Sequence, residues 1–286
     1  MTQPGHGTRD LRWRAVRLLQ RSRPRFWLYL AGPVAVGAAY GAGSTAALFS
    51  PVAAALFAYF LLPANLYLYG VNDVFDADAD AENPKKDGRE TRYDGDPLVA
   101  WAVAASALLG VLLAAWRPAV APAVLAFLAL GWAYSAPPRL KTVPPLDSLS
   151  NGLYVLPGVA AYVALAGRHP PLAALAGGWL WAMAMHTFSA IPDVEPDRRA
   201  GLRTTATVLG ERGALAYCGA CWLVAAAAFA LLDPRAGVLL AAYPVLTAGL
   251  ALSSVDVDRA YWWFPAINTA VGAVLTVAGL WRLTHG

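Results

Sequence analysis

The stretch that decides the fold is residues 46–80, AALFSPVAAALFAYFLLPANLYLYGVNDVFDADAD. Residues 46–70 carry no charged side chain, and about 20 such residues are enough for a helix to cross the hydrocarbon core of a bilayer. The residues that follow bring a dense run of aspartates at positions 73, 76, 78 and 80. The pattern predicts a membrane helix that ends in an acidic segment at the membrane surface.

The rest of the chain has the same character. Of its 286 residues 58% are hydrophobic and 14% are charged, whereas soluble domains average about 45–50% apolar and about 25% charged residues. This composition predicts an integral membrane protein and excludes an ordinary soluble enzyme. The two cysteines, Cys218 and Cys221, lie in an apolar run and are expected to pack as small hydrophobic side chains.

Nine apolar stretches are long enough to be membrane-spanning helices. They are Phe26–Gly43, Ala46–Gly70, Pro97–Trp116, Pro118–Ser135, Ser148–Gly167, Pro171–Ile191, Gly213–Leu232, Ala236–Ser253 and Tyr261–Leu283. No alternation typical of strands is present, and glycine and alanine recur at spacings that let membrane helices pack closely. We therefore predict an all-α bundle of nine transmembrane helices, with residues 26–286 forming one domain.

The charges indicate the orientation. Arginine and lysine near the ends of spans are retained on the cytoplasmic side. With the N-terminus inside, nine spans leave only four of the 22 basic residues outside, namely Arg117, Arg168, Arg235 and Arg282, together with one acid, Asp233. Residues 1–25 hold seven arginines and are predicted to be a basic cytoplasmic segment that contacts anionic lipid, which explains the net charge of +4 without a nucleic acid. The chemistry of the molecule is expected on the cytoplasmic side of a cell (inner) membrane.

Two groups of carboxylates end predicted helices on that side. Asn72, Asp76 and Asp80 are four residues apart and would share one helix face if the second helix continued. Asp193 and Asp197 repeat this spacing after the sixth span. A solvated acidic helix end is the alternative for either group alone. Two such groups at the same depth predict instead a set of oxygen ligands for Mg²⁺, which prefers carboxylates and is often shared with a phosphate.

Basic residues accompany both acidic groups. Arg139 and Lys141 lie in one predicted inner loop, and Arg198 lies beside the second group. A diphosphate bridged by Mg²⁺ is the substrate group that uses both signs of charge. His186, alone in an apolar helix, is more often a packed and hydrogen-bonded side chain than a ligand.

At these residues the chain resembles the UbiA superfamily of intramembrane prenyltransferases. The N-x-x-x-D-x-x-x-D motif of that family is matched by Asn72, Asp76 and Asp80, and its second motif by Asp193 and Asp197. Residues 134–141, YSAPPRLK, look like its Y-S-x-P-P-x-x-K stretch, whose lysine, here Lys141, contacts the diphosphate. The likeness covers nearly the whole chain.

The resemblance implies a cavity open to lipid in which the five motif residues bind Mg²⁺ and take part in catalysis, and in which Lys141, Arg139 and Arg198 bind an allylic diphosphate. The allylic fragment leaves with carbocation character, and aromatic faces can stabilise it. The residues expected to contact substrate are Tyr67, Tyr134, Ser135, Tyr154 and Phe188, and Tyr69 and Phe75 are further candidates for the cavity wall.

The acceptor is suggested by a departure from the family pattern. Relatives acting on aromatic acids carry an arginine shortly before the first motif, where this chain has Asn65 and Tyr67. The segments 72–89 and 144–158 look most like the branch that elongates lycopene. The resemblance thus implies transfer of a prenyl group from dimethylallyl diphosphate to lycopene or a related acyclic carotenoid. A quinone precursor, a chlorophyllide or a glycerol phosphate lipid is the alternative acceptor, and a cation-binding transporter is the alternative of another class.

Overall fold

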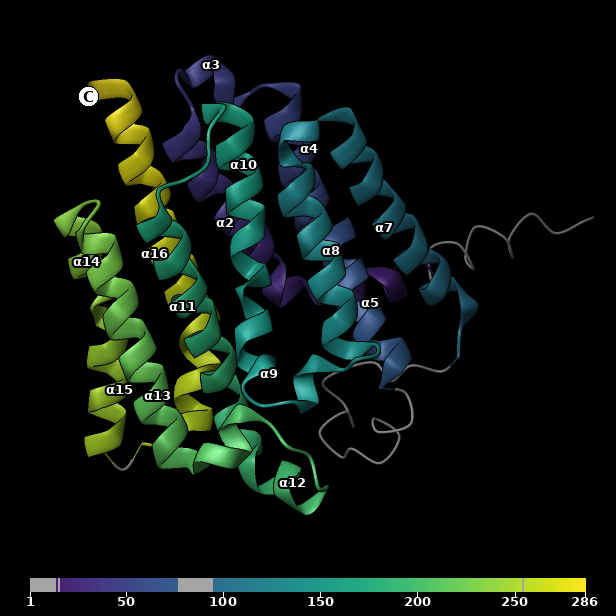
Figure 1. Cartoon of the computed structure of the whole chain (residues 1–286), viewed down its shortest axis with the longest axis vertical. Helices are drawn as coiled ribbons and strands as arrows, with labels where there is room; N and C mark the ends of the chain where they lie inside the picture. The colour runs from purple at the N-terminus through teal and green to yellow at the C-terminus, as the bar shows by residue number, and fades with distance from the viewer. Residues whose placement is uncertain (1–13, 15, 77–94, 254) are drawn as a thin grey trace, which may run out of the picture.

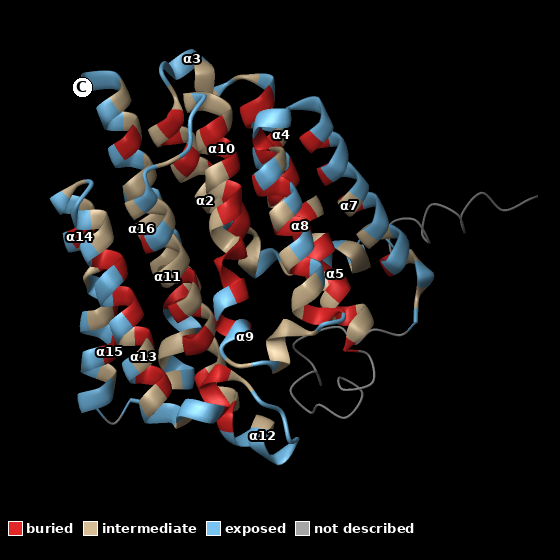
Figure 2. Ribbon diagram, in the orientation of Figure 1, coloured by how far each residue is buried: buried red, intermediate tan, exposed pale blue. Residues whose placement is uncertain are grey.

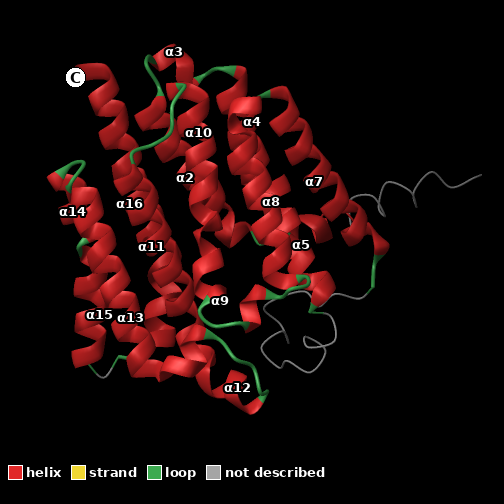
Figure 3. Ribbon diagram, viewed as in Figure 1, coloured by secondary structure: helices red, strands yellow, loops and turns green. Residues whose placement is uncertain are grey.

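A computed structural model describes residues 14, 16–76, 95–253 and 255–286. Every regular element in this part of the chain is a helix, which confirms the predicted all-α class (Figure 3). The long and short helices, in chain order, are α2 (Trp27–Gly41), α3 (Thr45–Leu48), α4 (Pro51–Leu61), α5 (Pro63–Phe75), α7 (Pro97–Trp116), α8 (Ala121–Ser135), α9 (Leu146–Leu149), α10 (Leu156–Ala166), α11 (Leu172–Ala190), α12 (Val194–Arg199), α13 (Thr205–Ala230), α14 (Pro234–Leu240), α15 (Ala242–Leu252) and α16 (Val257–His285).

Seven helical segments of the described residues are long and apolar enough to cross a membrane. They are Pro51–Phe75, Pro97–Trp116, Pro118–Ser135, Leu146–Ala166, Thr205–Ala230, Pro234–Leu252 and Val257–His285. The other two predicted spans form α2 and α11, which lie among these helices: α2 packs against α10 and α16, and α11 packs against α13 (Figure 1). The molecule is thus a helical membrane protein.

Several predicted spans are broken rather than continuous helices. The second is divided into α4 and α5 at Leu62, because Pro63 has no N–H to donate and its ring crowds the preceding turn. The fifth begins as α9, passes through a 3₁₀ segment, Ser150–Val155, and continues as α10. The seventh span, Gly213–Leu232, is formed largely by α13, which is kinked ahead of this span, where Gly210 has a positive φ (70°).

The connections sort to two ends of the bundle. The short helices α9 and α12 and the start of α16 lie at one end, and α3 and the C-terminus lie at the other (Figure 1). Arg139, Lys141, Asp193 and Asp197 belong to connections at the first end, which is called the motif end below. The helices therefore gather the predicted polar chemistry at one end of the molecule.

Two apolar cores hold the helices together, and Figure 2 shows their buried positions along the inward faces of the ribbons. One joins α2, α4, α5, α8 and α10, and the other joins α11, α13, α15 and α16. In the first core, α2 and α10 approach closely because Gly37 faces the Gly158 backbone. A large cavity lies between the two cores.

Candidate active site

The cavity has a volume of about 1470 Å³ and is lined by α2, α5, α8, α10, α11 and α16. Its wall includes Arg23 and Asn72 at the motif end and Asp233 and Arg282 at the opposite end. Along α2 the lining residues extend from Leu28 to Tyr40, which is about 18 Å at 1.5 Å per residue. The cavity therefore runs through most of the bundle, with charged groups at its two ends and mostly apolar walls between them.

The first acidic motif stands at one end of this cavity. Asn72 lies in the last turn of α5, and Asp76 caps the helix, because α5 ends at Phe75. The continuous helix expected through Asp80 is not observed within the described residues, and Asp80 itself lies outside them. Asn72 and Asp76 remain one turn apart, as the spacing predicted.

The loop after α8 brings its basic residues to this motif. The Lys141 ammonium donates to Asn72 Oδ1 (3.2 Å) and to an oxygen of Asp76. The Arg139 guanidinium donates to the other Asp76 oxygen (3.0 Å), and the Ser135 hydroxyl donates to Asn72 Oδ1 (3.0 Å). Residues 63 to 69 positions apart in the chain thus form one polar cluster. A single diphosphate at this cluster would meet two cations.

The second motif follows the end of α11. After α11 a 3₁₀ turn, Ile191–Asp193, leads into α12, so Asp193 ends the turn and Asp197 lies in the short helix. Figure 1 shows α12 at the motif end. Arg198 makes local contacts, since its guanidinium donates to the Thr207 carbonyl (2.8 and 3.1 Å) and to Glu195 (3.4 Å). These contacts hold α12 on the start of α13.

Carboxylate and amide oxygens of these motifs are the donors that Mg²⁺ prefers, so the chemistry of the donor set fits this ion. Among the described residues, no three His, Cys, Asp or Glu side chains form a group that could hold a metal ion. Asp80 is outside the described residues, and both Asp76 oxygens contact cations.

Three of the predicted aromatic residues line the cavity: Tyr69, Tyr134 and Tyr154. Tyr67 instead donates its hydroxyl to the Leu128 carbonyl (2.7 Å), and Phe188 is fully buried, stacked on Phe264 with ring centroids 4.3 Å apart. Phe75 packs on Trp132. The structure thus brings Tyr134 and Tyr154, but not Tyr67 or Phe188, to the cavity wall.

Two of the N-terminal arginines have a packing role that the sequence did not reveal. Arg21 contacts Asp73 (3.3 Å) with both side chains almost fully buried, and Arg23 contacts the same carboxylate at 3.5 Å. The Arg23 guanidinium also lies over the Tyr69 ring, 4.6 Å from its centroid. These arginines belong to the packed structure at the motif end as well as to the predicted lipid-facing segment. The sequence feature that indicated such a contact was Asp73, an acidic residue in an apolar helix that offers it no counter-charge.

Asp147, which the sequence did not single out, and His186, predicted to be a packed side chain, are two further polar residues of this region. The Asp147 carboxylate accepts hydrogen bonds from Thr205 N (2.7 Å) and Oγ1 (2.5 Å), which fastens α9 to the start of α13. Asn151 donates to the Asp147 carbonyl (2.6 Å). His186 and Asn151 line the cavity beside Tyr134.

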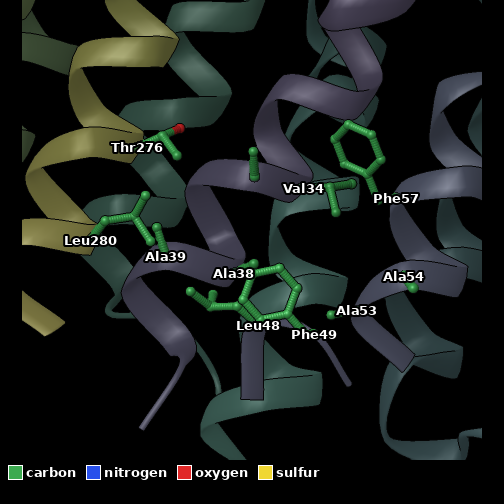
Figure 4. A pocket seen from close by; sticks show the side chains of 11 residues that line it. Val34, Ala38, Ala39, Leu48, Phe49, Ala53, Ala54, Phe57, Thr276 and Leu280 are labelled. Atoms are coloured by element: carbon green, nitrogen blue, oxygen red, sulfur yellow. The ribbon is translucent and has the colours of Figure 1, made fainter. Parts of the chain in front are cut away.

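A smaller pocket of about 390 Å³ lies between α2, α4 and α16 (Figure 4). Its wall is apolar apart from Thr276, and it shares Ala35, Ala39, Phe57 and Thr276 with the large cavity. It carries no ionisable side chain, so it can hold hydrocarbon but supports no acid–base chemistry.

Comparison with known proteins agrees with this geometry. The UbiA prenyltransferase family matches residues 30–265. The chain belongs to this family. This UbiA family member is 63% identical over 275 residues to the lycopene elongase/hydratase of Haloferax volcanii, covering 96% of this chain and 91% of that protein. It is 62% identical to the lycopene elongase/hydratase of Halobacterium salinarum, covering 93% of this chain and 97% of the other.

Solved structures of UbiA homologues share the fold. A UbiA homologue from Archaeoglobus fulgidus bound to GPP and Mg²⁺ matches with a TM-score of 0.70 at 22% sequence identity, covering 92% of this chain and 99% of the other. The same homologue bound to DMAPP and Mg²⁺ matches with a TM-score of 0.69. The described helices therefore adopt the UbiA fold.

Proposed function

We propose that this UbiA family member transfers a dimethylallyl group from its diphosphate to lycopene or a related acyclic carotenoid. The observation that carries the proposal is the cavity, a long and mostly apolar channel whose wall includes Asn72, the residue that Lys141 contacts together with Asp76. Relatives that are 57–63% identical and named lycopene elongase/hydratase support the acceptor. The Archaeoglobus fulgidus homologue bound to DMAPP and Mg²⁺ supports the donor.

The donor diphosphate binds at the motif end in this proposal. Lys141 and Arg139 meet its charge, and Ser135 orients Asn72 through the hydrogen bond between them. Asn72, Asp76, Asp80, Asp193 and Asp197 would hold Mg²⁺, which supplies charge neutralisation for the leaving diphosphate when bound. Arg198 supports the second motif by holding α12 on α13.

The allylic fragment faces aromatic rings once it separates from the diphosphate. Tyr69, Tyr134 and Tyr154 line this part of the cavity, and the negative faces of such rings stabilise a cation without reacting quickly with it. The apolar wall beyond them limits access of bulk water. A hydrocarbon acceptor can then add to the allylic carbon before water does.

The acceptor portion of the proposal rests on the uncharged residues at positions 65 and 67. Asn65 is buried and donates to the Phe60 and Leu61 carbonyls (3.0 Å each), and Tyr67 donates to Leu128. Neither offers the positive charge that an aromatic carboxylate would need. The terminal double bond of an acyclic carotenoid needs none: its electron pair forms the new carbon–carbon bond and leaves a tertiary cation at the neighbouring carbon.

The proposal includes the membrane arrangement. We infer nine spans, with α2 and α11 added to the seven long apolar helices, because both pack within the same bundle. The arginine-rich N-terminus and the motif end face the cytoplasm of a cell membrane, in accordance with the positive-inside rule. Membrane lipid surrounds the exposed apolar side chains, of which Trp101 and Leu252 are examples.

Expression in a host that accumulates lycopene tests the proposal. We expect pigments heavier than lycopene by one or two prenyl groups, detected by mass spectrometry, in cells carrying the wild-type chain. Cells with the Asp76→Ala variant at equal membrane abundance should retain lycopene. Unchanged lycopene in the wild-type strain, with the protein present and folded, contradicts the acceptor assignment.

A further inference from the structure

His186 is an imidazole in α11 that the transfer step does not use. It lines the cavity, and its Nε2 lies 3.3 Å from the Tyr134 hydroxyl, with the two rings edge to face at 88°. The Asn151 side chain, which donates to the Asp147 carbonyl (2.6 Å), lines the same cavity. His186, Tyr134 and Asn151 are therefore three polar side chains on the wall of a cavity that is mostly apolar.

This group has what a single water molecule needs. A buried water is retained where two to four polar partners surround it, and an imidazole, a phenol and an amide supply donors and acceptors together. A neutral imidazole has one nitrogen that accepts a proton.

The position of His186 matters because the carbocation of the proposed reaction must be neutralised nearby. In the proposed reaction, bond formation leaves a tertiary cation next to the new carbon–carbon bond, at the same end of the cavity as Asn72 and Tyr134. Water can capture this cation, or a neighbouring C–H bond can break to form a double bond. The choice depends on whether a water molecule and a proton acceptor stand beside the cation.

We propose that His186, with Tyr134 and Asn151, holds the water that captures this cation and accepts its proton. The water oxygen forms the bond to the tertiary carbon, one of its O–H bonds breaks, and the proton passes to the imidazole, so that the product is a tertiary alcohol and no oxidant is needed. The released diphosphate is the final proton acceptor. Without His186, the diphosphate removes a proton from carbon instead and the product has an additional double bond. This inference rests on the proposed prenyl transfer.

The test compares products from purified variants given lycopene, dimethylallyl diphosphate and Mg²⁺ in ¹⁸O-labelled water. The wild-type chain should give a prenylated alcohol that carries the label. In His186→Phe we expect total prenylated carotenoid within a few-fold of wild type, while the ratio of alcohol to dehydrated product falls about tenfold or more, as expected for loss of a positioned base. His186→Gln should lower the ratio too, because an amide can bind water but accepts no proton.

His169→Gln is the matched control, since His169 lies exposed in the connection between α10 and α11. It should leave the ratio unchanged. An unchanged ratio in folded His186→Phe, or full recovery in His186→Gln, overturns the inference. So does loss of all prenylated product in both folded variants, because His186 would then serve the transfer itself. Failure of the wild-type chain to prenylate lycopene contradicts the proposed function instead.

Discussion

Lys141 contacts both Asn72 and Asp76, which makes it the residue that joins the basic loop to the first motif. Asp76→Ala should lower turnover about 10²-fold or more, since losing a group that stabilises the leaving charge commonly costs several kcal/mol.

Lys141→Ala should raise KM for dimethylallyl diphosphate and lower turnover. Steady-state kinetics in detergent measure both effects.

Arg235→Ala is the control for the lysine, because Arg235 is exposed at the start of α14 and does not line the cavity. It should change neither parameter. Equal and small effects of Lys141→Ala and Arg235→Ala would mean that the loop after α8 is structural only.

Asp73 tests the role of the N-terminal arginines. Asp73→Asn leaves Arg21 buried without its counter-charge, and breaking a buried pair from one side costs about 3–5 kcal/mol. We expect a clearly lower thermal unfolding midpoint in detergent. Asp258→Asn, at an exposed position of α16, should leave the midpoint close to wild type. A midpoint unchanged by Asp73→Asn contradicts the packing role of Arg21 and Arg23.

At this scale the sequence predicted individual motifs better than contacts. The spacing of Asn72 and Asp76 and the basic residues of the loop after α8 pointed to a polyanion site, and the structure joins Asn72, Asp76, Ser135, Arg139 and Lys141. The pairing of Asp73 with Arg21 could not be read from spacing, because 52 residues separate them. The local use of Arg198 on Thr207 depends on the kink in α13, which hydropathy does not reveal.

Among the elements, the contact between α2 and α10 depends on glycine. A Cβ added at Gly158 would lie 2.8 Å from the Pro33 carbonyl oxygen, so one helix must shift. Gly158→Ala should destabilise the protein by about 1–3 kcal/mol, the usual cost of overpacking. Gly249→Ala on α15 meets no atom within 4 Å and should be neutral or slightly stabilising, since alanine favours helix. Thermal unfolding of both variants distinguishes these outcomes, and equal midpoints would contradict the close packing of α2 on α10.

Predicted element positions were accurate where apolar length determines them and poor where helices break. The span Pro97–Trp116 has the predicted bounds. Tertiary packing and proline cause the breaks at Leu62 and at Ser150–Val155 and the 3₁₀ turn before α12. Hydropathy therefore predicted each span but not the break within it.

The cavity is a property of the whole molecule, and filling it should separate donor from acceptor binding. Gly272 lines the cavity in α16, and an added Cβ there meets no atom within 4 Å. Gly272→Phe should reduce lycopene prenylation about tenfold or more, equivalent to about 1.4 kcal/mol of lost binding, while binding of dimethylallyl diphosphate is retained. Gly249→Phe, at an open position outside the cavity wall, is the control. Equal activity of the two variants would mean that the channel does not hold the acceptor.

The composition predicted a helical membrane protein, and the distribution of Arg and Lys predicted that charged residues gather at one end. The sequence did not predict the cavity, because its volume depends on how α2, α10, α11 and α16 diverge between two separate cores. Small residues such as Gly32 and Gly272 that leave space open are indistinguishable in sequence from glycines that permit close packing, such as Gly37.

Prenyl transfer to a carotenoid is tested most directly with the purified protein, dimethylallyl diphosphate and Mg²⁺, given lycopene or 4-hydroxybenzoate in separate reactions. We predict prenylated lycopene, little product from the aromatic acid, and no product from either after chelation of the metal. Efficient prenylation of 4-hydroxybenzoate with lycopene left untouched would contradict the assigned acceptor.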